Sequence, residues 1–252
     1  MQGIIHLSDL HIGYPGCTEA ARKIVGQIIR KITPPGKHVI VITGDLVENA
    51  FSTEQQREAA RQVKRFKKAG FKVLCAPGNH DCGTGVFGSK ELAAAFRKRF
   101  LGSAQAKFPK LNVIEGAAFI GLDSMADELN WHDRVFAEGE LGERQLMKLE
   151  LMLKSARVQK CQWKLVYLHH HPFSPLFLNE LKAAESLEKI IAGRVDALLF
   201  GHNHLGGVHN GRWGIPRCYD GGSSTGKEGA PREIRLIMLP LPPETDVLLP
   251  FC

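Results

Sequence analysis

Hydrophobic residues are gathered in short continuous runs, and five of these runs end at a group of polar residues. The runs cover residues 4–7, 39–42, 72–76, 164–168 and 195–200. Apolar runs of this length, bounded by glycine and polar residues, are typical of short strands buried in a sheet. The sequence therefore predicts a strand at each of these five places.

Segments with helical periodicity separate the predicted strands. Residues 18–32 carry apolar side chains at positions 20, 21, 24, 25, 28 and 29, which form one stripe on a helix, and Pro34-Pro35-Gly36 stops it. Further helices, the first of them capped by Ser52 or Thr53, are predicted at residues 53–69, 89–100, 143–158 and 179–191. The alternation of strands and helices predicts an α/β fold.

The pattern changes after residue 204. His209-Asn210-Gly211 is a turn signal between short strands, and residues 232–239 read as another strand, so we expect a small antiparallel second sheet. The proline-rich end, residues 240–252, is either irregular or packed on a partner chain. Without a repeat, linker or low-complexity tract, residues 1–252 are interpreted as one domain.

The polar residues that follow the five strands are all of types that bind metal ions. They are Asp9 and His11; Asp45; Asn79, His80 and Asp81; His169, His170 and His171; and His202 and His204. In open α/β sheets a ligand lies beyond the carboxyl ends of the strands, so these side chains can converge. Glycines at 44, 78 and 201 allow sharp turns and close approach there.

The chemistry of this set indicates a two-metal site. One such segment alone would more often be a polar strand end, but five at the same kind of position favour metal binding. The side chains are carboxylates, an amide and imidazoles without a thiolate, which suits Mn, Fe or Zn better than a structural zinc in a cysteine cage.

The series D-x-H, G-D, G-N-H-D, H-x-P and G-H-x-H resembles the calcineurin-like metallophosphoesterase superfamily, in the expected order over residues 4–204. Residues 221–225 and Asp123-Ser124 are also similar to the small bacterial members, which include cyclic-nucleotide phosphodiesterases. The resemblance implies a four-layer α/β/β/α sandwich of two mixed sheets with flanking helices and the metal site at one end.

The resemblance also implies which residues hold the two divalent ions. One ion would be bound by Asp9, His11, Asp45 and His204. The other would be bound by Asp45, Asn79, His170 and His202. Asp45 would bridge them, because a carboxylate offers two anionic oxygens to two cations.

Two positions leave alternatives open. The H-x-P pattern selects His170, and His169 is the alternative if the register differs, because side chains alternate along an extended backbone. His80 is the candidate that protonates the leaving group or stabilises the transition state, with Asp81 orienting its ring; the alternative is a histidine that only caps a loop.

Two cations can ionise a bridging water near neutral pH and hold the phosphoryl oxygens during attack by the resulting hydroxide. We therefore expect hydrolysis of a phosphodiester, either a cyclic nucleotide or another small diester. A phosphomonoesterase or a nucleotide-sugar pyrophosphatase with the same centre is the alternative. A non-catalytic scaffold is disfavoured, because every ligand position is filled.

Four other histidines and one long segment are not expected to hold the metal ions. His6 and His38 lie in apolar strands and are expected to be structural, and His132 and His209 are left outside the catalytic set. Residues 123–142, with Trp131, are too irregular for a standard element and are a candidate substrate-shaping loop.

Composition agrees with a compact enzyme whose apolar content is 44%. No stretch approaches the roughly 20 apolar residues of a membrane span, and the chain begins with a strand instead of a leader, so we expect a cytoplasmic protein. The six cysteines form no C-x-x-C pair and are expected to be free thiols.

The net charge of +7 raises a minor alternative, nucleic-acid binding. Basic residues cluster on the predicted helices 53–69 and 89–100, but no aromatic side chains that could stack on bases lie between them. A positive field also favours the approach of a small phosphate ester. A homodimer is left open.

Overall fold

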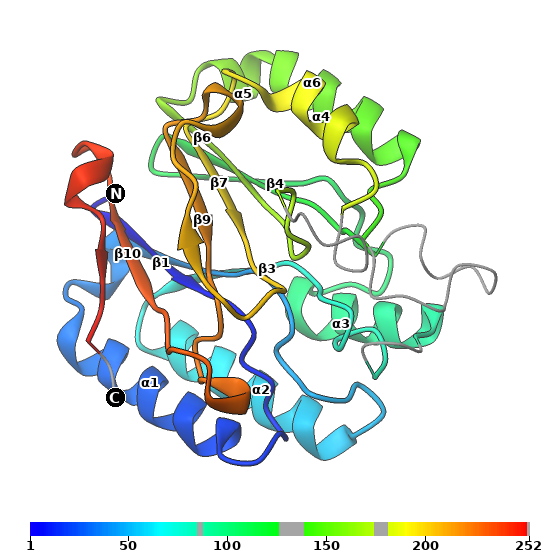
Figure 1. Ribbon diagram of the computed structural model, residues 1–252, viewed down its shortest axis with the longest axis vertical. Helices are drawn as coiled ribbons and strands as arrows, with labels where there is room; N and C mark the ends of the chain where they lie inside the picture. Colours follow the sequence, from blue (N-terminus) through cyan, green and yellow to red (C-terminus); the bar gives the residue numbers. More distant parts are fainter. Residues whose placement is uncertain (85–87, 126–138, 174–180, 251–252) are drawn as a thin grey trace.

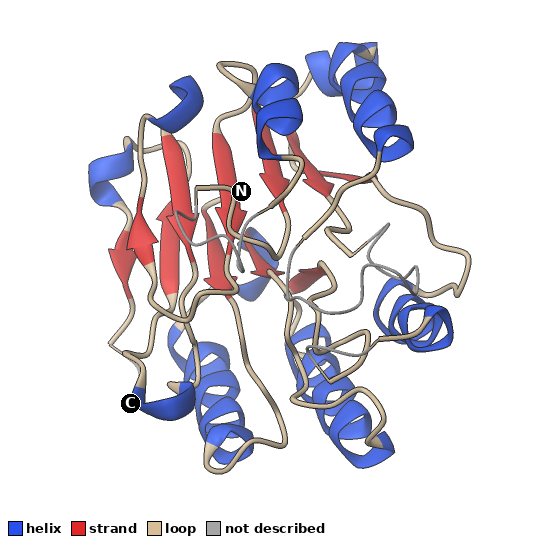
Figure 2. Ribbon diagram, turned by 45° about the vertical axis from the view of Figure 1, so that its right-hand side comes forward, coloured by secondary structure: helices blue, strands red, loops and turns tan. Residues whose placement is uncertain are grey.

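The computed structural model describes residues 1–84, 88–125, 139–173 and 181–250, and it consists of two mixed β-sheets packed face to face with helices outside (Figures 1 and 2). This is the four-layer sandwich that the family resemblance implied. The five predicted strands are present as β1 Gly3–Leu7, β2 His38–Ile42, β3 Lys72–Cys75, β6 Trp163–Tyr167 and β7 Ala197–Phe200.

The remaining strands complete two sheets. They are β4 Lys110–Ile114, β5 Ala117–Gly121, β8 Gly207–Val208, β9 Arg217–Asp220, β10 Arg235–Met238 and β11 Val247–Leu248. The five-stranded sheet has the order β11-β10-β1-β2-β3, and the six-stranded sheet has the order β4-β5-β6-β7-β9-β8. In the six-stranded sheet, parallel strands at the centre are flanked on both sides by an antiparallel strand. In the five-stranded sheet, β1, β2 and β3 are parallel, and the antiparallel pairings with β10 and β11 lie on one side only.

The central strands are buried on both faces, which explains why they read as unbroken apolar runs. In β1, Ile4 packs between the sheets in the same core as Phe119 and Tyr167. The next residue, Ile5, points the other way, toward the core beneath the helices. Side chains alternate along a strand, so each central strand contributes to two cores at once.

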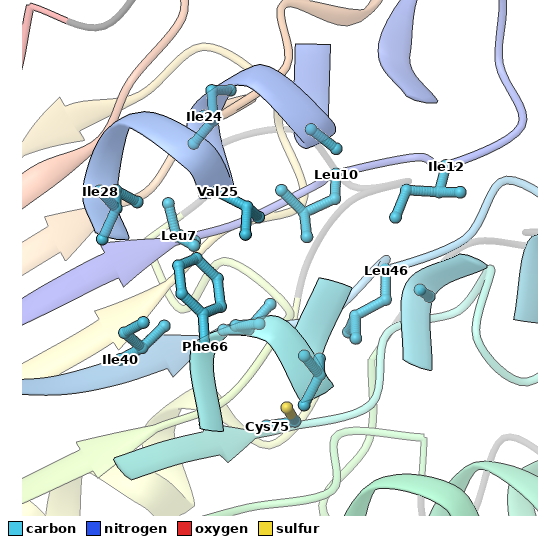
Figure 3. Packing of buried hydrophobic residues seen from close by; sticks show 14 of the residues in the cluster. Leu7, Leu10, Ile12, Ile24, Val25, Ile28, Ile40, Leu46, Phe66 and Cys75 are labelled. Atoms are coloured by element: carbon cyan, nitrogen blue, oxygen red, sulfur yellow. The ribbon is translucent and has the colours of Figure 1, made fainter. Parts of the chain in front are cut away.

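Helices cover the outer face of each sheet. Those over the five-stranded sheet are α1 Cys17–Lys31, α2 Thr53–Lys68 and α3 Lys90–Leu101. Those over the six-stranded sheet are α4 Glu143–Lys154, α5 Ala156–Gln159 and α6 Ala184–Ile191. Figure 3 shows Ile24 and Ile28 of α1 and Phe66 of α2 gathered over Leu7 and Ile40. Within the described part of the chain, no helix has the length and apolar character of a membrane span.

Helix ends follow local hydrogen bonding. The hydroxyl of Ser52 accepts a hydrogen bond from the Gln55 amide at the start of α2, as predicted. The predicted helix at 143–158 is instead broken at Ser155, whose backbone is extended and whose side chain caps α5. A serine hydroxyl competes with helical backbone bonding, and this explains the break.

The strands after residue 204 do not form a separate antiparallel sheet, contrary to expectation. Strands β8 and β9 extend the six-stranded sheet, whereas β10 and β11 extend the five-stranded one. The end of the chain is held by β11 and by an ion pair of 2.8 Å between Arg217 and Asp246. The β4–β5 hairpin was not predicted, and its turn is made by Glu115 and Gly116, both with positive φ.

The described cysteines agree with the expectation of free thiols. Cysteines 17, 75, 82, 161 and 218 are unpaired and buried. Cys252 lies outside the described residues.

His6 is a structural histidine, and it makes stability depend on pH. Its Nε2 lies 2.9 Å from Thr43 Oγ1 in the core, and burial together with the charge of Arg235 lowers its pKa to about 3. As the pH falls below about 6.5, the His6 ring becomes protonated in the unfolded chain but stays neutral in the folded chain. Acidification therefore favours unfolding. We expect that His6 lowers the free energy of unfolding by roughly 2 kcal/mol when the pH falls from 7.5 to 5.

Urea unfolding of the wild type and of His6→Gln at both pH values measures this effect. The glutamine keeps a side-chain amide beside Thr43 and does not titrate, so the variant should lose less stability on acidification. Equal losses in the two proteins would contradict the assignment.

Candidate metal centre

The five polar segments meet beyond the carboxyl ends of β1, β2, β3, β6 and β7, as the topology of the sheets requires. Backbone hydrogen bonds join the loops: the Asp9 amide donates to Gly44 at 3.1 Å, and the Gly201 amide donates to the His169 carbonyl at 2.9 Å. The second of these bonds connects loops of the six-stranded sheet, and the first connects loops of the other sheet.

Asp9, His11 and His204 form the first group of possible ligands. One ligand atom from each lies within 4.8 Å of the others. The Nε2 atoms of His11 and His204 are 2.9 Å apart, and Asp9 Oδ1 lies 3.3 Å from His204 Nε2 and 3.7 Å from His11 Nε2. Asp9 and His11 are fully buried.

The second group surrounds His169 Nε2. This atom lies 3.4 Å from Asp45 Oδ2, 3.0 Å from Asn79 Oδ1 and 3.1 Å from His202 Nδ1. The group therefore combines a carboxylate, an amide oxygen and two imidazoles. Such a mixture suits a transition-metal ion of borderline softness.

Asp45 lies between the two groups. Its Oδ2 is 3.6 Å from His11 Nε2 in one group and 3.4 Å from His169 Nε2 in the other. Its Oδ1 accepts a hydrogen bond of 2.9 Å from the His80 amide. The position of Asp45 is the one that a bridging carboxylate requires.

The structure places His169, not His170, at this centre. His169 continues the face of β6 that carries Leu165 and Tyr167 into the core between the sheets, and its Nδ1 lies 2.8 Å from the Thr43 carbonyl. His170 points away, and its Nδ1 lies 2.7 Å from Ser124 Oγ. The alternation that the sequence analysis used was sound, but it did not show which face of β6 meets the other sheet.

Asp81 was expected to orient the His80 ring, but in the structure it forms no hydrogen bond or ion pair with this ring. It accepts hydrogen bonds from the backbone amides of Leu46, Val47 and Gly78. The Nδ1 atom of His80 instead lies 2.6 Å from a backbone carbonyl, that of Glu48. Asp81 therefore holds together the two loops that carry Asp45 and Asn79.

Glu48 was missed by the sequence analysis, although it follows Asp45 by three residues. Its Oε2 lies 2.7 Å from His11 Nδ1, and Lys227 Nζ lies 3.0 Å from the same oxygen. Ser8 was missed as well, and its hydroxyl donates a hydrogen bond to Asp9. Neither residue stands in a liganding position, and neither carried a signal in the sequence.

Negative charge dominates the electrostatics of the centre. Burial disfavours the charged form of His11, but hydrogen bonds with Asp9 and Glu48 outweigh it and raise the pKa of the ring to about 9. Burial acts likewise on His169, yet mainly the charge of Asp45 raises its pKa to about 10. The same field attracts divalent cations, and a bound cation releases such protons.

The backbone and the glycines also fit a metal centre. Left-handed φ angles are uncommon outside glycine and cost roughly 1–3 kcal/mol each, and they cluster at functional sites. They occur here at Asp9, His11, Asp45, His202 and His204.

Glycines 78 and 201 make room for the two carboxylates. A Cβ atom on Gly78 would lie 2.2 Å from Asp45 Oδ1, and one on Gly201 would lie 2.5 Å from Asp9 Oδ2. Asp9 Oδ1, the carboxylate oxygen that faces His11 and His204, is buried without a hydrogen-bond partner. Such orphaned atoms are expected where a cation completes the site.

His38 and His209 lie outside the two groups. His38 Nδ1 contacts the Pro34 carbonyl at 3.0 Å, and the His209 ring packs edge-on against His171 with centroids 5.1 Å apart. Trp131 and His132 lie outside the described residues, as does most of the candidate substrate-shaping loop, residues 126–138.

Solved structures share this fold at low sequence identity. A putative 5'-nucleotidase from Staphylococcus aureus is 14% identical with a TM-score of 0.58, and the match covers 98% of this chain but 52% of that protein. The phosphopantetheinyl hydrolase from Mycobacterium tuberculosis is 14% identical with a TM-score of 0.59, over 95% and 96% of the two chains. A calcineurin-like phosphoesterase from Bacillus subtilis is 12% identical with a TM-score of 0.54, over 98% and 87%.

This chain thus spans about half the length of the Staphylococcus aureus protein. No curated protein matches it. The model of the calcineurin-like phosphoesterase family matches residues 3–206, which carry all the ligand candidates and most of both sheets. The chain belongs to the calcineurin-like phosphoesterase family.

Proposed function

We propose that the protein is a metal-dependent phosphoesterase that hydrolyses a small phosphodiester with the help of two divalent ions, Mn, Fe or Zn. The observation that carries the proposal is the position of Asp45, with one oxygen 3.6 Å from His11 and 3.4 Å from His169. Two ligand groups that share a carboxylate are what two adjacent cations need. The family supports phosphoester hydrolysis, and the choice of a diester is our proposal.

The ligand assignment differs from the sequence prediction at one residue. We assign one ion to Asp9, His11, Asp45 and His204, and the other to Asp45, Asn79, His169 and His202. His169 takes the place expected for His170 because its Nε2 is the atom on which the second group converges. When bound, the two cations would activate water and stabilise negative charge on the phosphoryl oxygens.

His80 is the residue that we assign to the leaving group. Its Nδ1 faces the Glu48 carbonyl, which can only accept, so this nitrogen carries a proton. The Nε2 atom can then donate only when the ring is protonated. His80 therefore acts as a general acid in its imidazolium form, and it takes this proton back from solvent after each turnover.

Removing divalent metal tests the proposal. Protein dialysed against a chelator should lose hydrolysis of bis(p-nitrophenyl) phosphate, and added Mn²⁺ should restore it, because the chain supplies no nucleophile of its own in this proposal. Thermal unfolding of both samples checks that the fold survives. Full turnover by metal-free protein would contradict the proposal.

The same Mn²⁺-loaded protein distinguishes the substrate classes. A diester, p-nitrophenyl phosphate as a monoester, cyclic AMP and a nucleotide sugar are compared by kcat/KM. Preference for the diester or cyclic AMP supports the proposed phosphodiesterase. Preference for the monoester or the nucleotide sugar would replace it with a phosphomonoesterase or a pyrophosphatase on the same centre.

A further inference from the structure

A buried lysine reaches the metal centre from the part of the chain beyond the family match. Lys227 lies in the loop after β9, and its side chain is 7% exposed. Its Nζ lies 3.0 Å and 3.3 Å from the two carboxylate oxygens of Glu48, and 5.2 Å from the centre of the Tyr14 ring. An ammonium group is costly to bury unless it is paired, so this pairing with Glu48 is needed to keep it there.

Glu48 lies between Lys227 and His11 and contacts both side chains. Lys227 Nζ is 3.5 Å from His11 Nδ1, whereas Glu48 Oε2 is 2.7 Å from it. The shorter contact decides the arrangement: the carboxylate accepts the Nδ1 proton, and the lysine interacts with the shared carboxylate. The Nε2 atom of His11 is then left as the ligand atom facing Asp9 and His204.

The loop that carries Lys227 is fastened to the segment just before His11. Two hydrogen bonds join Ser8 and Ser224. The Ser8 amide donates to Ser224 Oγ at 3.0 Å, and the Ser224 amide donates to the Ser8 carbonyl at 2.9 Å. Thr225 Oγ1 donates to the Leu10 carbonyl at 3.1 Å. The lysine is therefore held in register with the metal ligands.

We propose that Lys227 is a positioning residue of the metal centre, which orients the Glu48 carboxylate and thereby fixes the tautomer and direction of His11. The inference rests on the proposed role of His11 as a metal ligand. A lysine that binds substrate phosphate would face the solvent, but here both nearest acceptors belong to Glu48 and the side chain is buried.

The test measures metal binding without substrate. Wild type, Lys227→Met, Glu48→Gln and the double variant are stripped of metal, and the Mn²⁺ dissociation constants are determined by calorimetric titration. Loss of an outer-shell partner typically weakens metal binding about 10- to 100-fold, and we expect Lys227→Met at the lower end of this range. Because Lys227 acts through Glu48, the double variant should bind no more weakly than Glu48→Gln alone.

Lys154→Met is the matched control, since it removes an exposed lysine 2.6 Å from Glu150 on α4. It should leave the dissociation constant unchanged. Wild-type affinity in Lys227→Met, or effects that add up in the double variant, would overturn the inference. A higher KM with unchanged Mn²⁺ affinity would instead assign Lys227 to the substrate and also overturn it.

A second variant and the wild-type result separate failure of this inference from misfolding and from failure of the proposed function. Lys227→Gln removes the charge but keeps a polar side chain, and it replaces the methionine variant in the same comparison if the latter does not fold. A wild type that binds no Mn²⁺ contradicts the proposed function itself, which is a separate result from normal binding in the Lys227 variants.

Discussion

Replacing His169 by alanine is expected to remove one ion and to lower turnover by more than the roughly 10- to 100-fold typical of an outer-shell partner. His169 Nε2 lies within 3.4 Å of ligand candidates on three different loops, so the variant lacks the atom on which these loops converge. His170→Ala should keep both ions, because that ring bonds to Ser124. Metal analysis and kcat of the two variants check the prediction.

The two histidines are matched controls for each other. Both are fully buried and adjacent in sequence, so both variants leave a cavity of similar size. Thermal unfolding should therefore show comparable destabilisation in the two proteins. Loss of an ion from His170→Ala with both ions retained in His169→Ala would restore the assignment that the H-x-P pattern predicted.

Replacing His80 by alanine is expected to keep both metals and to slow turnover by roughly 10²- to 10⁴-fold, the range of general acid catalysis. The loss should be largest for poor leaving groups. A p-nitrophenol ester needs little proton transfer, whereas an alkyl ester needs much. The ratio of variant to wild-type kcat should therefore rise as the leaving group improves, which a series of substituted phenyl and alkyl diesters measures.

His38→Gln provides the control for His80, because His38 begins β2 and bonds to Pro34. It should leave kcat unchanged for every ester. If His80→Ala instead slows all esters by one common factor with both metals present, His80 stabilises the phosphoryl oxygens or positions the substrate. The general acid would then be another group.

Much of the fold was predictable because it is encoded in contiguous residues. The central strands are buried on both faces, so their apolar runs marked them within a residue or two. The Ser52 cap is likewise local, because its hydroxyl bonds to an amide three residues later. The polar character of the strand ends was also predictable, since it depends only on which side chains follow each run.

Partners that are distant in the chain were not predictable. Residues 235–238 read correctly as a strand, but pairing with β1 was decided by packing, because a single strand is compatible with several neighbours. The β4–β5 hairpin was overlooked because its first strand is only partly buried and lacks a clean alternation. The residues that form a strand are determined locally, but the sheet that the strand joins is not.

The candidate metal centre likewise combines features that were predictable from the sequence with contacts that were not. The sequence determined that aspartate, asparagine and histidine side chains meet beyond the ends of parallel strands. Only the tertiary structure placed His169, and not His170, beside Asp45, because this placement depends on which face of β6 turns toward the other sheet. It also brought Lys227 to His11 across 216 residues, a contact that arises from the packing of two loops and leaves no pattern in either segment.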